Sequence, residues 1–139
     1  MNNLIVIAHS NKSSFCYNGI FKTIHGVLME NKEPVRVIDL YEDGYVQTGE
    51  KTEEYKKTIE WSERMYFISP VWWFRCATLM ENFFDVVFTP GFAYKFVPVI
   101  ATYGYPKPLL KSKKVRTYLT HGAPALPVYT IYLNSVKLR

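Results

Sequence analysis

The sequence has few of the residues on which disulfide-rich and metal-binding proteins depend. Only Cys16 and Cys76 are cysteines, they form no Cys-x-x-Cys pair, and the three histidines are scattered along the chain. Disulfide frameworks need several cysteines, and zinc sites need closely spaced cysteines or histidines. We therefore expect a reduced, cytoplasmic protein that has no metal site.

Long apolar runs and a signal peptide are also missing. The longest apolar stretches are too short and too interrupted to span a bilayer, so we expect no membrane insertion. The first seven residues, MNNLIVI, lack the basic residues and the cleavage site of a secretory leader. We expect them to form the start of a first strand.

The composition of the 139 residues is that of an ordinary globular protein, with 48% hydrophobic and 21% charged residues, and we expect one domain over 1–139. A formal net charge of +5 raises the question of nucleic-acid binding. No recognition motif accompanies this charge, so we favour a solvated basic loop and expect no nucleic-acid partner. A positive field would also attract an anionic nicotinamide cofactor. The basic residues concentrate late in the chain, at Lys107, Lys111, Lys113, Lys114, Arg116, Lys137 and Arg139.

Apolar strands alternate with helical segments along the chain. This alternation predicts an α/β fold with a doubly wound parallel sheet, helices on both faces, and the strand order 2-1-3-4. Residues 89–112, with four prolines, are expected to form a long loop, and such loops are uncommon unless they are functional. Residues 128–138 fit a helix or a strand. The predicted strands are 4–8, 35–40, 65–69 and 115–120, and the predicted helices are 17–31, 53–64 and 77–88.

The loop after the first strand, residues 9–16, is rich in hydroxyl groups and precedes a helix. Free backbone N–H groups at a helix N-terminus, together with serine hydroxyls, can bind a phosphate. The alternative is that Ser13 or Ser14 only caps the helix. The loop is neither Gly-x-Gly-x-x-Gly nor a Walker loop, which argues against a Rossmann dinucleotide site and against an NTPase.

The loop after the third strand carries two adjacent tryptophans, Trp72 and Trp73, followed by Phe74. Aromatic faces stack on planar ligands, and open α/β sheets bind ligands at the carboxyl ends of their strands. This loop therefore indicates a site for a flat ligand. The alternative is that the aromatic side chains pack a dimer interface or the core.

Three loops and the segment 89–94 resemble those of the flavodoxin-like NAD(P)H:quinone oxidoreductases. His9, Ser14 and Phe15 match the family's His-Pro-x-x-x-Ser-Phe-Asn phosphate loop, whereas Cys16 stands in place of the usual Asn. Residues 70–73 match a Pro-x-Trp-Trp loop, 89–94 match Thr-Pro-Gly-Phe-Ala-Tyr, and 120–122 match a Thr-His-Gly loop. The resemblance favours the flavodoxin-like order of strands and a helix at 128–138.

The resemblance implies a flavin-dependent enzyme that transfers hydride from NAD(P)H to a quinone or similar acceptor. Its flavin is expected to be FMN, with FAD as the alternative, and a homodimer is expected because the aromatic stretch 72–105 exceeds what one small core can bury. The implied catalytic residues are His121 and Tyr129. The implied flavin-binding residues are His9, Ser14, Phe15, Cys16, Pro70, Val71, Trp72, Trp73, Phe74, Thr120, His121, Gly122 and Ala123.

A second function remains open. Members of the family continue into a fifth strand and a final helix, which this sequence is expected to lack, and residues 75–86 depart from the family pattern. Both departures suit a non-enzymatic regulatory protein that binds flavin weakly or not at all, like the ancillary subunits of potassium-efflux systems. A one-electron flavodoxin fits less well, because flavodoxins are usually acidic and this chain is basic.

Overall fold

The computed structural model describes residues 1–44, 49–100 and 103–122. In chain order the first elements are β1 (Asn3–Ile7), a π-helical segment (Cys16–Phe21) that continues into α1 (Lys22–Glu30), β2 (Val35–Asp39) and α2 (Gly49–Trp61). The remaining elements are β3 (Arg64–Trp72), β4 (Arg75–Cys76), α3 (Thr78–Val87), β5 (Tyr94–Ile100), β6 (Tyr103–Pro108) and β7 (Lys114–Thr120).

The main sheet confirms the predicted fold. Its parallel strands lie in the order β2-β1-β3-β7, and β7 is the fourth strand expected from the sequence. Asn3 lies opposite Val35 on one side and opposite Arg64 on the other, which places β1 in the interior of the sheet. Residues 4–8 are fully buried, as a central parallel strand requires.

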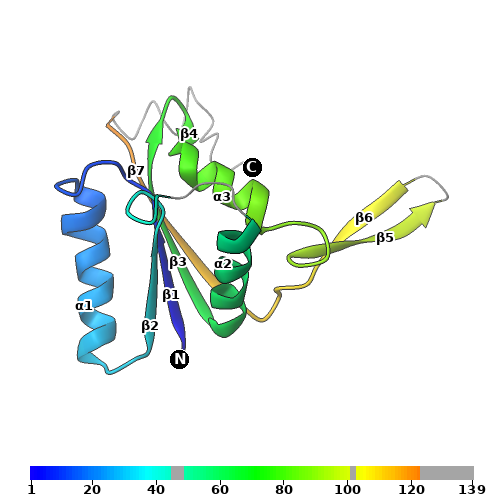
Figure 1. Cartoon of the computed structure of the whole chain (residues 1–139), viewed down its shortest axis with the longest axis horizontal. Helices are drawn as coiled ribbons and strands as arrows, with labels where there is room; N and C mark the ends of the chain where they lie inside the picture. Colours follow the sequence, from blue (N-terminus) through cyan, green and yellow to red (C-terminus); the bar gives the residue numbers. More distant parts are fainter. Residues whose placement is uncertain (45–48, 101–102, 123–139) are drawn as a thin grey trace.

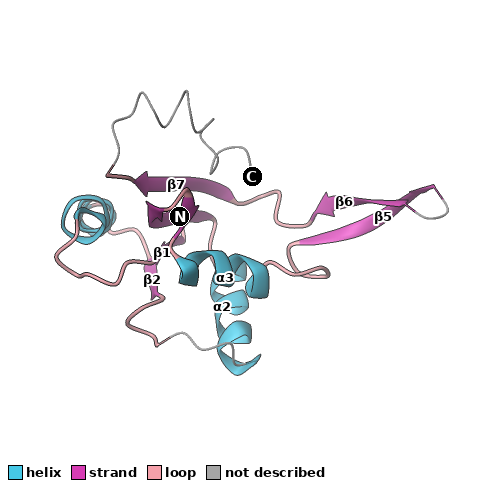
Figure 2. Cartoon of the chain, turned by 90° about the horizontal axis from the view of Figure 1, so that it is seen from above, coloured by secondary structure: helices cyan, strands magenta, loops and turns pink. Residues whose placement is uncertain are grey.

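Helices cover both faces of the sheet, with α1 on one side and α2 and α3 on the other (Figures 1 and 2). Alternate β1 side chains enter two separate cores, because successive residues of a strand point to opposite faces. Ile5 and Ile7 pack in the core that includes Leu28 of α1, and Leu4 and Val6 pack in the opposite core. That second core also contains Tyr55, Ile59, Met80, Phe83 and Val87 from α2 and α3.

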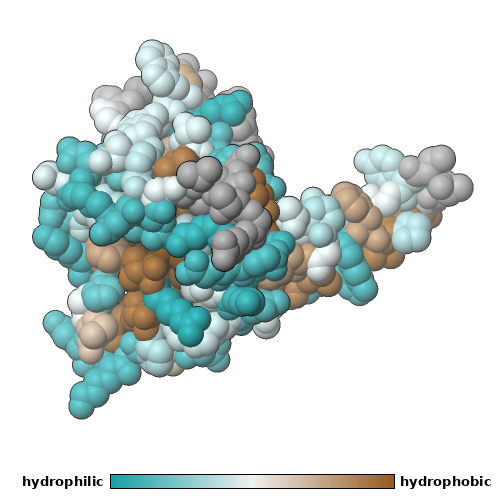
Figure 3. Space-filling view, viewed as in Figure 1, coloured by the Kyte–Doolittle hydropathy of each residue, from teal (hydrophilic) through white to brown (hydrophobic). Residues whose placement is uncertain are grey.

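The prediction of a long loop over 89–112 was wrong. This segment contains the antiparallel strands β5 and β6, which form a hairpin that projects away from the main sheet (Figure 1). Its β-branched and aromatic residues favour strands, and a two-stranded hairpin has free edges that tolerate proline. Pro98 lies at a register irregularity of the hairpin. Apolar side chains show along this arm in Figure 3, and Phe96, Val99, Tyr103 and Tyr105 are each at least 59% exposed.

Smaller differences concern where elements begin and end. The third strand continues to Trp72 instead of ending at residue 69, so the first of the two adjacent tryptophans belongs to the strand. The helix predicted at 17–31 starts with a π-helical segment, and the segment 128–138 lies outside the described residues. No helix in the described part of the chain is long and apolar enough to span a bilayer.

Candidate functional site

The three loops singled out in the sequence leave the same edge of the sheet. The N–H of Ala8, just after β1, donates to the carbonyl of Ile68 in β3 at 3.0 Å. Pro70 of β3 lies opposite Thr120 of β7. The ends of β1, β3 and β7 are therefore adjacent, in the position where open α/β sheets bind ligands.

The loop after β1 is ordered by its own hydrogen bonds. His9 Nδ1 accepts from the N–H of Asn11 at 2.9 Å, and Asn11 Oδ1 accepts from the N–H of Ser13 at 2.8 Å. His9 is partly buried, which lowers its pKa and favours the neutral imidazole that this bond requires. Asn11 was not predicted as a site residue, although Asn is a common side chain in turns.

The hydroxyl of Ser14 has no hydrogen-bond partner among the described residues, although its oxygen is buried. The capping alternative is not supported for Ser14, because the segment that begins at Cys16 shows no side-chain cap. Buried hydroxyls are normally paired, so an unpaired one in a loop before a helix suits an absent ligand. A phosphate oxygen would supply the missing partner.

Phe15 covers the start of the helical segment. A Cβ on Gly19 would lie 2.3 Å from a ring carbon of Phe15, so the ring can pack in this position only because residue 19 has no side chain. The ring itself is 70% exposed. An apolar face is thus held at the rim of the loop.

Cys16 connects the first loop to the last strand. Its thiol is buried and lies 3.2 Å from Thr120 Oγ1 at the end of β7. Burial raises the pKa of the Cys16 thiol, so the neutral form prevails at pH 7. The residue that replaces the family's asparagine therefore makes a contact within the protein.

The aromatic loop forms the turn of a short hairpin between β3 and β4. Val71 pairs with Cys76 and Trp72 pairs with Arg75, which leaves Trp73 and Phe74 as the turn. Both have positive φ, 49° and 65°. Such turns favour Asn and Gly, and bulky residues in this conformation are strained by about 1–2 kcal/mol each.

The strained turn exposes its aromatic groups instead of burying them. Trp73 is 91% exposed, and the exposed fractions of Trp72 and Phe74 are 42% and 45%. The Trp72 ring meets His9 edge to face, with 5.4 Å between ring centroids. Strained backbone of this kind is often found at ligand sites.

Ser69 holds this hairpin in place, although it was not among the predicted site residues. Its buried hydroxyl donates to the carbonyl of Pro70 and accepts from the N–H of Ala77, each at 3.0 Å. The second bond ties the start of α3 to the end of β3. The position of Ser69 at the end of an apolar run could have indicated such a role.

A charged cluster beside the first loop was not predicted from the sequence. Asp39, at the end of β2, accepts hydrogen bonds from Lys12 and from the hydroxyl of Tyr17, the latter at 2.7 Å. Lys12 also pairs with Glu42 at 2.8 Å. Burial, and after it the hydrogen bond to Asp39, together raise the pKa of Tyr17 to about 12.

The remaining predicted residues lie at or beyond the end of the described chain. His121 and Gly122 are exposed at the end of β7, and Ala123 and Tyr129 lie outside the described residues. No group of three or more potential metal ligands occurs in the described ranges.

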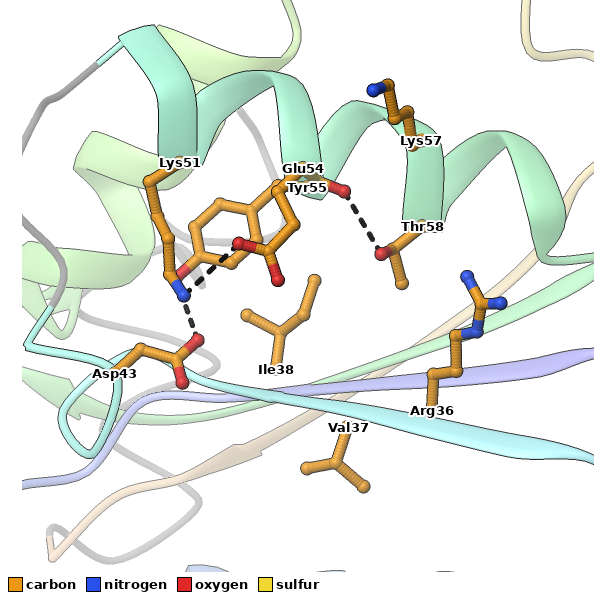
Figure 4. Close-up of a pocket in the computed structure, with 9 residues that line it drawn as sticks. All are labelled: Arg36, Val37, Ile38, Asp43, Lys51, Glu54, Tyr55, Lys57 and Thr58. Atoms are coloured by element: carbon orange, nitrogen blue, oxygen red, sulfur yellow. Dashed lines mark hydrogen bonds and ion pairs between the residues drawn. The ribbon is translucent and has the colours of Figure 1, made fainter.

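A pocket of about 500 Å³ lies elsewhere, between β2 and α2 (Figure 4). Charged and hydroxyl groups there bind one another: Lys51 pairs with Glu54, and Tyr55 donates to Asp43. The pocket contains none of the predicted flavin-binding residues, so we place the candidate site at the three loops. The pocket is lined by Arg36, Val37, Ile38, Asp43, Lys51, Glu54, Tyr55, Lys57 and Thr58.

The chain is similar to known proteins of one fold. Residues 1–130 match the model of a family, Flavodoxin_2, described as having a flavodoxin-like fold. An uncharacterized NAD(P)H oxidoreductase of Haemophilus influenzae is 26% identical over an alignment of 137 residues, and the match covers 88% of this chain and 65% of that protein. The chain thus spans just under two thirds of the length of this curated relative.

Two solved structures share the fold. The NAD(P)H:quinone oxidoreductase from Methanothermobacter marburgensis has a TM-score of 0.80 at 21% identity, over 99% of this chain and 75% of the other. General stress protein 14 of Treponema denticola, solved in complex with FMN, has a TM-score of 0.60 at 22% identity, over 98% of this chain and 79% of the other.

Proposed function

Because the chain belongs to this flavodoxin-like family, we propose that it is a flavoprotein that oxidises NAD(P)H and reduces a quinone or a similar two-electron acceptor. Support comes from the relative called an NAD(P)H oxidoreductase and from the fold shared with a quinone oxidoreductase. The FMN complex of another protein of this fold favours FMN over FAD.

The observation that carries the proposal is the convergence of three unlike loops at one edge of the sheet. Ser14 offers an unpaired hydroxyl for the phosphate, and Trp72 and Trp73 offer exposed aromatic area for the ring. The loop from Thr120 to Ala123 would supply backbone amide donors to the ring. His9, Phe15, Cys16, Pro70, Val71, Phe74, His121 and Gly122 complete the proposed site.

Bound flavin would supply the hydride chemistry, and the protein would supply position and charge stabilisation. The aromatic hairpin would exclude water from one side of the ring. Amides of the loop after β7 would stabilise negative charge on the pyrimidine. Gly122 has no side chain, which would allow its backbone to approach the ring closely. We propose His121 and Tyr129 as the catalytic residues, as the resemblance implies.

A homodimer is part of the proposal. The β5–β6 hairpin exposes Phe96, Val99, Tyr103 and Tyr105, and a solvated hairpin with so much apolar surface needs a partner. A second copy would bury it. Sedimentation at micromolar concentration should give a dimer, and Tyr103→Ser with Tyr105→Ser should give a monomer, whereas Lys95→Ser on the same hairpin should not. A monomer in the unmutated protein would exclude this arrangement.

The test of the function begins with colour. Purified protein should be yellow, and the flavin-free chain should quench the fluorescence of added FMN. The loaded protein should then oxidise NADH or NADPH when a benzoquinone is present, with ping-pong kinetics. If the protein quenches the fluorescence of neither FMN nor FAD, the enzyme proposal should be dropped.

One observation favours a second candidate, a non-enzymatic regulatory protein that binds flavin weakly or not at all. The thiol of Cys16 contacts Thr120, so it is directed within the protein where the family carries a phosphate contact. Failure of both flavins to bind would support this candidate, and turnover with a quinone would exclude it.

A further inference from the structure

Asp39 is a buried acid next to the proposed cofactor loop. It ends β2 and lies opposite Ile7, the last residue of β1. It is 9% exposed, and among the residues whose side chains are described it is the one charged residue that is buried. A buried carboxylate is costly unless it is paired and fully hydrogen-bonded, so its partners indicate why it is there.

The carboxylate uses both oxygens. Oδ1 accepts from the N–H groups of Tyr41 and Glu42, at 3.2 and 3.1 Å, which fixes the carboxylate to its own turn. Oδ2 accepts from Lys12 and from the Tyr17 hydroxyl. One rigid acceptor thus holds two side chains from another part of the chain.

Those two side chains flank the serine of the proposed phosphate site. Lys12 lies in the loop before Ser14, and Tyr17 lies in the helical segment after it. The ammonium group of Lys12 also lies 4.5 Å from the centre of the Tyr17 ring, which closes the cluster. The loop that carries Ser14 is therefore held on both sides by one carboxylate.

We propose that Asp39 is a positioning residue for the cofactor phosphate, an inference that rests on the proposed function. Asp39 holds Lys12 and Tyr17 and so fixes the loop that presents Ser14. In this arrangement the ammonium group of Lys12 is bound by two carboxylates. Its charge is matched by Asp39 and Glu42, so neutral donors of the loop would bind the phosphate.

The first experiment uses the flavin-free protein and measures hydrogen exchange of the amides in residues 9–18. Asp39→Asn keeps the shape of the side chain but turns an NH₂ group toward Lys12 or toward the backbone donors. Exchange in the loop should rise on the order of tenfold, the equivalent of one lost charge-assisted hydrogen bond. Glu42→Gln is the matched control, because Glu42 is an exposed partner of Lys12. In this variant the exchange of the amides in residues 9–18 should stay unchanged.

The second experiment compares FMN with riboflavin, which lacks the phosphate. Asp39→Asn should weaken FMN binding on the order of tenfold and leave riboflavin binding unchanged, since only the phosphate loop is altered. Damage to the whole fold would weaken both flavins equally. Tyr17→Phe removes one donor from the same carboxylate and should give a smaller loss of FMN binding in the same direction. This variant also tests the proposal if Asp39→Asn fails to fold.

The outcomes separate this role from the proposed function. If the unmutated protein prefers FMN and the preference is unchanged in Asp39→Asn and Tyr17→Phe, only the role of Asp39 is overturned. A stronger preference for FMN in Asp39→Asn also overturns it, because Lys12 would then be a phosphate ligand that Asp39 competes for. If the unmutated protein binds neither flavin, the proposed function fails and this role fails with it.

Discussion

Cys16 Sγ and Thr120 Oγ1 lie 3.2 Å apart and join two segments that are 104 residues apart in the sequence. The contact ties the start of the first helical segment to the end of β7. It brings the proposed phosphate loop and the proposed pyrimidine loop to one place.

A double-mutant cycle should detect this contact. Cys16→Ala and Thr120→Val should each destabilise the protein, and the pair should lose less than the sum by about 0.5–1 kcal/mol, the worth of one weak hydrogen bond. Urea unfolding of the four proteins gives the coupling energy. Strict additivity would mean that the two groups do not interact in solution.

The strained aromatic turn predicts a difference between two truncations of Trp73. Glycine accepts a φ of 49° without cost, so Trp73→Gly should be more stable than Trp73→Ala by about 1 kcal/mol. Neither change removes buried area, because the side chain is 91% exposed. Equal unfolding free energies in urea would contradict a strained turn.

Flavin binding should depend more on Trp73 than on Ser14. Trp73→Ala removes an aromatic face, whereas Ser14→Ala removes one hydrogen bond of about 1 kcal/mol. Titration of FMN by fluorescence quenching should therefore show a sharp loss in the first variant and a loss of about tenfold or less in the second. The reverse order would place the ring away from the β3–β4 turn.

Ser69→Ala should loosen the aromatic hairpin. It leaves the buried N–H of Ala77 without its acceptor, at a cost of about 1–3 kcal/mol. Thr78→Ala is the control, because Thr78 is the exposed first residue of α3, and its stability should stay close to that of the unmutated protein. Thermal or urea unfolding decides, and equal stability of the two variants would count against the Ser69 bond.

Stability should fall on mild acidification because of His9. Burial lowers the pKa of His9 below 6.5, so the unfolded chain binds the proton more readily than the folded one. The stability that neutral His9 contributes is present above about pH 6.5 and declines as the pH falls toward the lowered folded pKa. His9→Gln should reduce this dependence. An NMR titration that gives His9 a pKa of 6.5 or above would contradict this pH dependence.

The sequence by itself determined the sheet and the places where loops leave it. Continuous apolar runs such as 4–8 are typical of strands that are buried on both faces of a parallel sheet, and the alternating helices indicate right-handed crossovers. The resemblance of the loops then favoured the order that the sheet has. The motifs at 9–16, 70–74 and 120–122 could be located because each directly follows such a run.

Only the tertiary structure decided how those loops are built. The partners of Asp39 and Cys16 come from distant parts of the chain, and no local pattern specifies a pairing between them. The positive φ at Trp73 and Phe74 opposes local preference and is imposed by the β3–β4 pairing. The β5–β6 hairpin was missed because its prolines indicate a loop, and an isolated pair of strands, with both outer edges free, can accommodate them.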